Sequence, residues 1–245
     1  MVHHGVVTAP APPLLVDLSP IAQVRAGRLV RRFPQLFIGL WLYGASLALM
    51  VRGDLGLAPW DVLHSGLIRH VPVTLGQMVV IASLVVLLLW IPLREKPGIG
   101  TVANAFLVGI SADVTLALLD RPDHMAVRVT LMLAGVFFNG VATALYIGSQ
   151  FGRGPRDGLM TGLVRRTGMK LAPVRTGIEI TVVVLGVLLG GALGAGTLLY
   201  AFALGPLTQW MLPWFAVPLV VTVQAVADPT DEVDPPAEAD RSDPA

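Results

Sequence analysis

Long uncharged apolar stretches alternate with short polar ones along this chain. Residues 33–51, 71–93 and 129–152 contain no charged side chain, and each supplies about the 20 residues that a helix needs to cross a bilayer. Similar apolar runs recur toward the end of the chain. The pattern predicts six transmembrane helices, at about 33–51, 72–93, 98–119, 129–150, 171–190 and 194–213. Residues 214–227 contain further proline and are expected to lie at the membrane interface.

Two further segments, 57–70 and 154–168, are predicted to be helices that are too short to cross. Pro59 and Pro155 suit the first turn of a helix, and Asp61 and Asp157 follow them by two residues. A helix of 12 residues reaches only about 18 Å, whereas the hydrocarbon core is about 30 Å thick. Each short helix is therefore expected to be re-entrant or interfacial, and the sequence leaves that choice open.

The second half of the chain repeats the first at an offset of 96 residues. Between 32–116 and 128–212 there are 23 identities in 85 aligned pairs without a gap, and they concentrate on Gly, Pro and Asp. Chance in such an apolar composition would give roughly a third as many. The repeat predicts two membrane units, 25–120 and 121–227. They are flanked by a tail at 1–24 and an acidic tail at 228–245, both expected to be disordered.

Three crossings per unit is an odd number, so the two units should be inverted relative to each other. The Lys and Arg counts of equivalent loops support this, because the cytoplasmic loop of each pair should hold more of them. The counts are four against two before the first crossing, two against six around the short helix, and two against none at the next turn. We therefore predict an all-α integral membrane fold of two inverted three-helix repeats, with both termini cytoplasmic.

Composition excludes several classes of protein. The chain is 54% hydrophobic and 13% charged, whereas soluble domains hold about 25% charged residues. It contains no cysteine, so disulfides, thiolate ligands and thiol nucleophiles are absent. Its basic residues flank apolar spans, which predicts contact with the lipid bilayer and no nucleic acid. No metal-ligand spacing or nucleophile–base arrangement is visible, so we expect no enzyme activity, metal or cofactor.

Asp61 and Asp157 are the first candidate functional residues, together with Pro59 and Pro155. A carboxylate in the first turn of a helix can simply accept backbone N–H bonds and complement the helix dipole. Alternatively, two broken helices direct their starts at a solute, and the carboxylates meet a cation or a proton. Both interpretations are carried forward.

Polar residues inside the predicted spans form a second set. They fall at matching positions of the two units: Tyr43 with Asn139, Asn104 with Tyr200, Asp113 with Gln209, and Ser83 with Glu179. Polar groups in spans avoid lipid, so these residues are expected to face a shared interior, as a solute path or as hydrogen-bonded glue between helices. Glu179 follows Arg175 by four residues, which would let the two neutralise each other.

Three stretches carry a resemblance to a known family. GDLGLAPWDVLH at 53–64, KPGIGT at 96–101 and GRGPRDGLM at 152–160 resemble the YczE/YitT-type family of bacterial integral membrane proteins, over about 33–215. The resemblance implies a multi-pass protein of the bacterial plasma membrane. It assigns no activity, so no functional residue is transferred.

Two functions follow as hypotheses. Inverted repeats with broken helices are a recurrent plan of transporters, which favours a small-solute transporter or permease. The alternative is an accessory protein that scaffolds or regulates a membrane or biosynthetic partner, and a homodimer also stays open. A water-accessible cavity that reaches Asn104, Asp113 and Tyr200 would favour the transporter, and a dry interior the scaffold.

Overall fold

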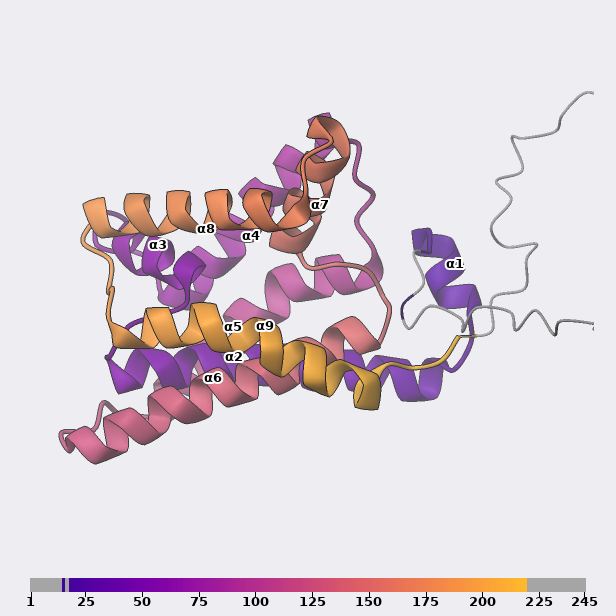
Figure 1. Cartoon of the computed structure of the whole chain (residues 1–245). Coiled ribbons are helices and arrows are strands. Elements are labelled where there is room, and N and C mark those ends of the chain that lie inside the picture. Colours follow the sequence, from indigo (N-terminus) through magenta and orange to yellow (C-terminus); the bar gives the residue numbers. More distant parts are fainter. Residues whose placement is uncertain (1–14, 16–17, 220–245) are drawn as a thin grey trace, which may run out of the picture.

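The computed structural model describes residue 15 and residues 18–219, and this part of the chain is helical throughout (Figure 1). It holds nine helices: α1 Pro20–Arg25, α2 Leu29–Gly53, α3 Pro59–Leu67, α4 Leu75–Leu93, α5 Ile99–Leu118, α6 Met125–Gly148, α7 Pro155–Thr167, α8 Leu171–Leu188 and α9 Ala195–Phe215. The predicted spans and short helices correspond to α2–α9 in order. The all-α class and the presence of two short helices are confirmed.

Five of the described helices are long and apolar enough to cross a membrane, namely α2, α4, α5, α6 and α8. The predicted sixth crossing corresponds to α9. This helix has 21 residues and no charge, but it is less apolar, since it contains Thr208, Gln209 and two internal prolines. A sixth crossing therefore stays a prediction.

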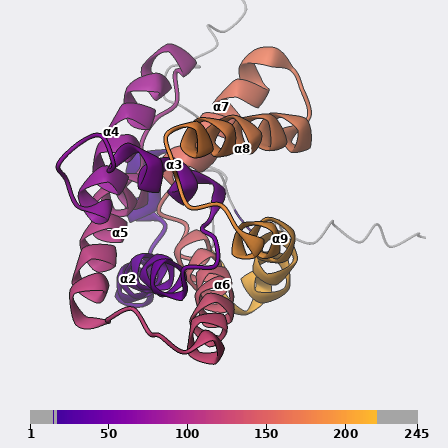
Figure 2. The same ribbon diagram turned by 90° about the vertical axis from the view of Figure 1, so that its left-hand side faces the viewer.

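Helices α2 and α6 lie side by side and antiparallel, with α5 on one side of the pair and α9 on the other (Figure 2). Arg128, in the first turn of α6, donates to the carbonyl of Gly53 at the end of α2, with an Nε–O distance of 3.0 Å. At the other end, Arg32 in the first turn of α2 donates to the carbonyl of Ser149 after α6, at 2.7 Å. Helix α5 packs against α2, and α9 packs against α6.

The short helices pack against the opposite unit. Helix α3 lies against α8, and α7 lies against α4. Gly186 of α8 lies against the backbone of α3, where an added Cβ would be 2.6 Å from the amide nitrogen of Leu63. At the other contact, the ring of Trp90 on α4 lies over Gly158 of α7, and its Nε1 donates to the carbonyl of Pro155 at 2.9 Å. Each predicted unit therefore contributes a short helix to the other.

Local sequence explains how the short helices begin. Pro59 and Pro155 occupy the first turn of α3 and α7, where a missing N–H costs no helix hydrogen bond. Gly56 and Gly152 precede them with φ of 118° and 109°, a conformation that residues with a Cβ rarely adopt. These glycines let the chain turn back toward the interior directly after α2 and α6.

Corresponding hydrogen bonds occur in both units. The Gly100 N–H donates to the Phe151 carbonyl at 2.8 Å, and the Gly196 N–H donates to the Leu55 carbonyl at 2.8 Å. The two donors are 96 residues apart, and so are the two acceptors, which is the offset of the sequence repeat. Each ties the start of α5 or α9 to the loop that precedes a short helix of the other unit.

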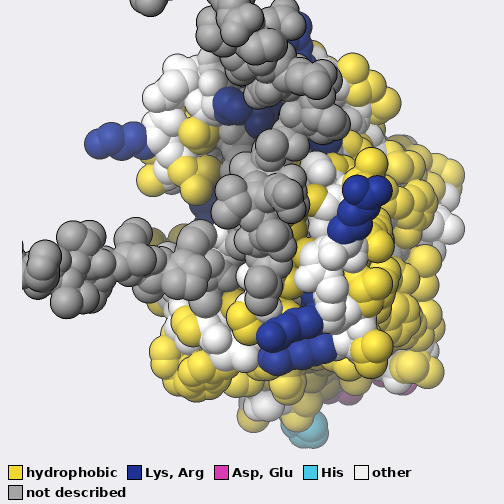
Figure 3. Space-filling view, turned by 90° about the vertical axis from the view of Figure 1, so that its right-hand side faces the viewer, with side chains coloured by type: hydrophobic (Ala, Val, Ile, Leu, Met, Phe, Trp, Pro, Cys, Tyr) yellow, Lys and Arg dark blue, Asp and Glu magenta, His cyan; other side chains and the backbone are white. Residues whose placement is uncertain are grey.

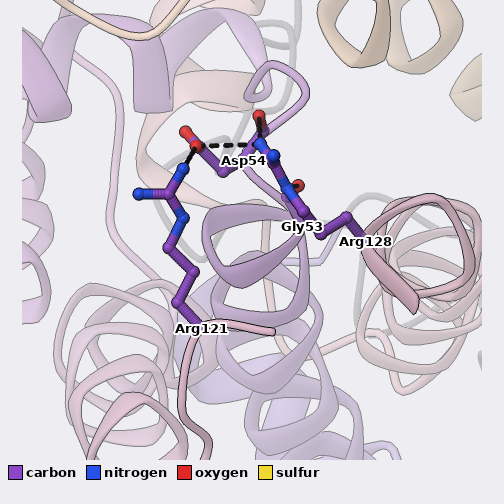
Figure 4. Close-up of polar contacts among 4 residues, drawn as sticks. All are labelled: Gly53, Asp54, Arg121 and Arg128. Atoms are coloured by element: carbon purple, nitrogen blue, oxygen red, sulfur yellow. Dashed lines mark hydrogen bonds and ion pairs between the residues drawn. The ribbon is translucent and has the colours of Figure 1, made fainter. Parts of the chain in front are cut away.

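Two arginines form a second corresponding pair, here called the arginine clamps. In addition to the Ser149 carbonyl, Arg32 binds the Gln150 carbonyl, with an Nη2–O distance of 2.8 Å. In addition to the Gly53 carbonyl, Arg128 binds the Asp54 carbonyl, at 2.6 Å (Figure 4). The surroundings differ, because Arg32 is fully buried, whereas Arg128 also meets the Asp54 carboxylate at 2.9 Å.

The prediction of a disordered tail at 1–24 is wrong for its last residues. Helix α1 begins at Pro20, Ser19 accepts a hydrogen bond from the Ala22 N–H, and Gln23 is buried. This helix is held by the Arg32 clamp, whose Nη1 donates to the Gln23 carbonyl at 2.6 Å. Such a long-range contact leaves no local signal in the sequence. Residues 1–14 and 16–17, the end of the 214–227 segment beyond 219, and the tail at 228–245 lie outside the described residues.

Candidate functional site

Two adjoining cavities lie between the helices. The first has a volume of about 50 Å³ and is bordered by α2 to α7. The second, of about 180 Å³, is bordered by α3, α6, α7, α8 and α9. They share four lining residues, namely Trp60, Tyr146, Arg156 and Asp157. We call the two together the central site.

The starts of both short helices reach the central site. Trp60 and Asp61 of α3 line it, as do Pro155, Arg156 and Asp157 of α7. The first N–H groups of a helix have no partner within it and carry a partial positive charge. The site therefore receives the positive ends of two helices, one from each unit.

Asp61 forms a buried pair with His64 one turn later on α3. The Nδ1 atom of His64 lies 3.0 Å from a carboxylate oxygen of Asp61, and both residues are buried. The backbone cap of α3 receives no side-chain hydrogen bond. The Asp61 carboxylate is directed to the imidazole and accepts no first-turn N–H bond among the described residues. It still lies in the first turn of α3, where it complements the helix dipole as the structural interpretation expects.

Asp157 occupies the equivalent position of the second unit but has a different partner. The phenol of Tyr146 donates to its carboxylate at 2.5 Å, and α7 also lacks a side-chain cap. Asp157 also lies in the first turn of α7, so the helix-dipole part of the structural interpretation holds here as well. Met160 stands where the first unit has His64, so the two aspartates share their position but not their chemistry.

Arg156 supplies a positive charge to both cavities. Its guanidinium carbon lies 5.2 Å from the centre of the Tyr43 ring, over the face of the ring. Among the described residues no carboxylate lies within ion-pair distance of it. A half-buried guanidinium that is held only by an aromatic ring can bind an anionic or hydrogen-bond-accepting group.

Several buried polar atoms at the central site lack a hydrogen-bond partner within the described part of the chain. Three line the first cavity, namely the Tyr43 hydroxyl, the Trp60 Nε1 and the His64 Nε2. Two further such atoms, the hydroxyls of Thr143 and Thr208, belong to residues that line only the second cavity, which Trp60 also borders. A buried polar group without a partner costs about 1–3 kcal/mol. Water or a polar solute in the cavities would remove that cost.

Most of the predicted polar residues also meet at this site. Asn104 and Ser83 line the first cavity with Tyr43. Glu179 and Tyr200 line the second, and Glu179 binds the Nε of Arg175 at 2.9 Å as its spacing predicted.

Asn139 acts as glue between three helices. Its amide donates to the Ser46 hydroxyl on α2 at 2.8 Å and accepts from the Tyr200 hydroxyl on α9 at 3.0 Å. For Asn139, the interpretation as hydrogen-bonded glue between helices is confirmed.

Asp113 lines neither cavity of the central site, but it acts as hydrogen-bonded glue between α5 and the start of α4, the second of the two predicted roles. Its carboxylate accepts from the Gly76 N–H at 2.8 Å and from the Thr74 hydroxyl. It thereby holds the first turn of α4, whose free N–H groups attract a carboxylate. Its counterpart Gln209 lines the second cavity but is largely exposed.

The sequence reasoning missed four residues of the site. Trp60, Tyr146 and Arg156 lie beside the two aspartates, and His64 is paired with Asp61. For His64 a signal existed, because residues three apart on a helix lie on one face. For Tyr146 no local pattern indicated that α6 would bring its hydroxyl to α7.

Comparison with known proteins places the chain in a family. Residues 30–213 match the "Family of unknown function (DUF6198)". An "Uncharacterized protein" of Haemophilus influenzae is 36% identical over 177 residues, which cover 72% of this chain and 81% of that protein. The "Uncharacterized membrane protein YczE" of Bacillus subtilis is 32% identical over 187 residues, covering 76% and 87%.

No solved structure matches the chain. The relatives and the apolar helices agree in indicating a multi-pass membrane protein. The resemblance inferred from the sequence motifs is confirmed, and this chain belongs to the DUF6198 family.

Proposed function

We propose that this protein is a permease for a small polar solute, which binds in the central site. One observation carries the proposal. The starts of α3 and α7, with Asp61 and Asp157, meet at adjoining cavities lined by residues whose buried polar atoms have no partner among the described residues. A packed scaffold has no need of such groups, since each one destabilises a dry interior. A permease needs them to replace the water that surrounds its solute.

The repeat gives this site a mechanism. We infer that the two units form inverted repeats, with α9 as the sixth crossing. The antiparallel packing of α2 and α6, the paired hydrogen bonds at Leu55 and Phe151, and the arginine clamps support this arrangement. In inverted-repeat carriers, equivalent junctions on opposite faces open in turn around a fixed site. The Leu55–Gly196 and Phe151–Gly100 junctions would then be the two seals.

The charge distribution supports an orientation with both termini cytoplasmic. Figure 3 views the end of the molecule that bears α1, where Lys and Arg side chains are exposed at the surface. The same end holds the loops around Arg94 and Arg153. Basic loops stay on the cytoplasmic face of bacterial membranes, so this distribution supports a cytoplasmic position for α1 and the start of α2. A location in the plasma membrane is part of the same proposal.

A ligand screen tests the proposal. We expect at least one small polar metabolite to raise the melting temperature of the purified protein. Because Arg156 and Asp157 border both cavities, Arg156→Gln and Asp157→Asn should each weaken its binding about tenfold, a loss of about 1.4 kcal/mol. Asp120→Asn, at an exposed carboxylate far from the site, is the matched control. Unchanged affinity in both site variants would remove the central site from solute binding.

Labelling in intact cells tests the inverted arrangement. His70 and Arg166 are both exposed, near the ends of α3 and α7, and the native chain has no cysteine. We expect a membrane-impermeant thiol reagent to label a single cysteine at position 70 and to spare one at position 166. Permeabilised cells, in which both positions should react, provide the control. Labelling of both in intact cells, or of 166 alone, would contradict inversion.

A further inference from the structure

The Asp61–His64 pair borders the first cavity and leaves one ring nitrogen of His64 without a partner among the described residues. A carboxylate can only accept hydrogen bonds, so the hydrogen between the two residues belongs to Nδ1 of His64, 3.0 Å from Asp61. In a neutral imidazole the other nitrogen, Nε2, then carries a free lone pair. Within the described part of the chain this Nε2 is buried and has no partner, and the residue as a whole is only 6% exposed.

The charges around this pair do not balance while the imidazole is neutral. The titratable side chains that face the two cavities come from six helices: Tyr43 on α2, Asp61 and His64 on α3, Tyr146 on α6, Arg156 and Asp157 on α7, Arg175 and Glu179 on α8, and Tyr200 on α9. Helix α4, which also packs against α3, contains no titratable side chain. With the carboxylates ionised, three negative groups face two guanidiniums. One proton on His64 makes the site neutral.

We propose that His64, oriented by Asp61, is the proton-binding residue that couples solute movement to proton movement through this protein. The inference rests on the permease function proposed above and adds its coupling ion. The proton adds to the lone pair of Nε2 from water on one face, giving an imidazolium paired with the Asp61 carboxylate. It leaves from the same atom toward the other face, and only this N–H bond forms and breaks.

The physical reason for coupling is the cost of net charge inside a membrane. Enclosing a site with one excess negative charge between two closed seals has a high free energy, because the charge is removed from water. The free energy of enclosing a neutral site is much lower. Proton binding would therefore favour the state in which the site is closed to both faces. Imidazole suits this task because it is the side chain that ordinarily changes charge between about pH 5 and 8.

The second unit lacks this group. Met160 replaces His64 there, and the Asp157 carboxylate is already bonded to the Tyr146 phenol. The inverted repeat thus carries a single proton site, which gives one proton for each transport cycle.

Proton binding can be measured without knowing the solute. In a chain with His3, His4, His70 and His124 all replaced by Gln, His64 is the last histidine. Nitrogen-15 NMR of this single-histidine protein, labelled at histidine and held in nanodiscs, reports the protonation of each ring nitrogen. We expect Nε2 to change from the unprotonated to the protonated state between pH 8 and pH 5. A ring that keeps one protonation state across this range would overturn the proposal.

A second measurement tests whether the proton changes the conformation. Ile68 and Val164 are half-buried and occupy equivalent positions of α3 and α7. Single cysteines at these positions report accessibility near the two faces. At each pH the labelling rate at position 68 is divided by the rate at position 164. This ratio cancels the effect of pH on the ionisation of the thiols. We expect this ratio to change about threefold or more between pH 5.5 and 8, as a shifted two-state equilibrium would give. His64→Gln, which keeps a donor to Asp61, should make it constant, and His70→Gln should leave the change intact.

The outcomes separate this inference from the permease itself. A ratio that changes when a stabilising metabolite is added, but not with pH, would keep the permease and remove His64 as its coupling site. A pH-dependent ratio that survives His64→Gln would also overturn the inference, since another group would then bind the proton. A ratio insensitive to both metabolite and pH would contradict the permease as well.

Discussion

Replacing Gly44 by alanine is expected to destabilise the protein by about 2 kcal/mol or more. Gly44 lies where α2 crosses α5, and an added Cβ would be 2.2 Å from the backbone carbonyl oxygen of Val108. It would also lie 2.8 Å from the Ala112 amide nitrogen. Backbone atoms cannot rotate away as a side chain can, so the two helices would have to separate. The free energy of unfolding in a fixed detergent and lipid mixture measures the loss.

Gly177 on α8 provides the matched control, because an added Cβ there meets nothing within 4 Å. Alanine at this position should be neutral or should stabilise the helix by up to about 1 kcal/mol, since glycine is a poor helix former. A Gly44→Ala protein that is as stable as Gly177→Ala would show that α2 and α5 are not in close contact.

Replacing Arg32 by methionine is expected to cost about 3 kcal/mol or more. Methionine keeps much of the apolar stem of this fully buried residue but removes the guanidinium. The carbonyls of Gln23, Ser149 and Gln150 then lose their charged donor. The stacking of the guanidinium on Phe151, at 4.1 Å from the ring centre, is lost as well. The loss is measured as a change in the free energy of unfolding.

Arg31→Met is the control for this prediction, since Arg31 is exposed on the same turn of α2. It should change stability by no more than about 0.5 kcal/mol. If the two variants lose equal stability, the clamp at Arg32 does not hold the end of α6.

The helices of this protein were predictable because their signals are local. Long, predominantly apolar runs predicted α2, α4, α5, α6 and α8, and Pro59 and Pro155 placed the starts of α3 and α7. The position of the central site was also accessible in part, since the repeat singled out Asp61 and Asp157. What these aspartates bind could not be read from the repeat, because their partners differ between the units.

The positions at which the two units carry different residues were the hardest feature to interpret from the sequence. The structure explains them. Trp90 in the first unit corresponds to Gly186 in the second, and Val62 corresponds to Gly158. The large Trp90 packs on Gly158, and Gly186 packs on the backbone of Val62. In each contact a glycine lets another group come close, a tryptophan ring in one and a helix backbone in the other. The sequence alone showed two unrelated differences between the units, since nothing in it indicated that short helices and spans exchange partners.

This exchange of partners also affects how the protein is made. Helix α3 leaves the ribosome long before α8, and the bond between Ser65 and the Ala192 amide joins residues 127 positions apart. At a synthesis rate of about 5–20 residues per second, α3 waits roughly 6–25 s for its partner. Throughout that time α3 lacks the helix against which most of it packs, and nine residues are too few to settle across the bilayer. Helix α7 finds α4 already inserted. The first half of the chain therefore depends on the membrane insertion machinery for longer than the second half does.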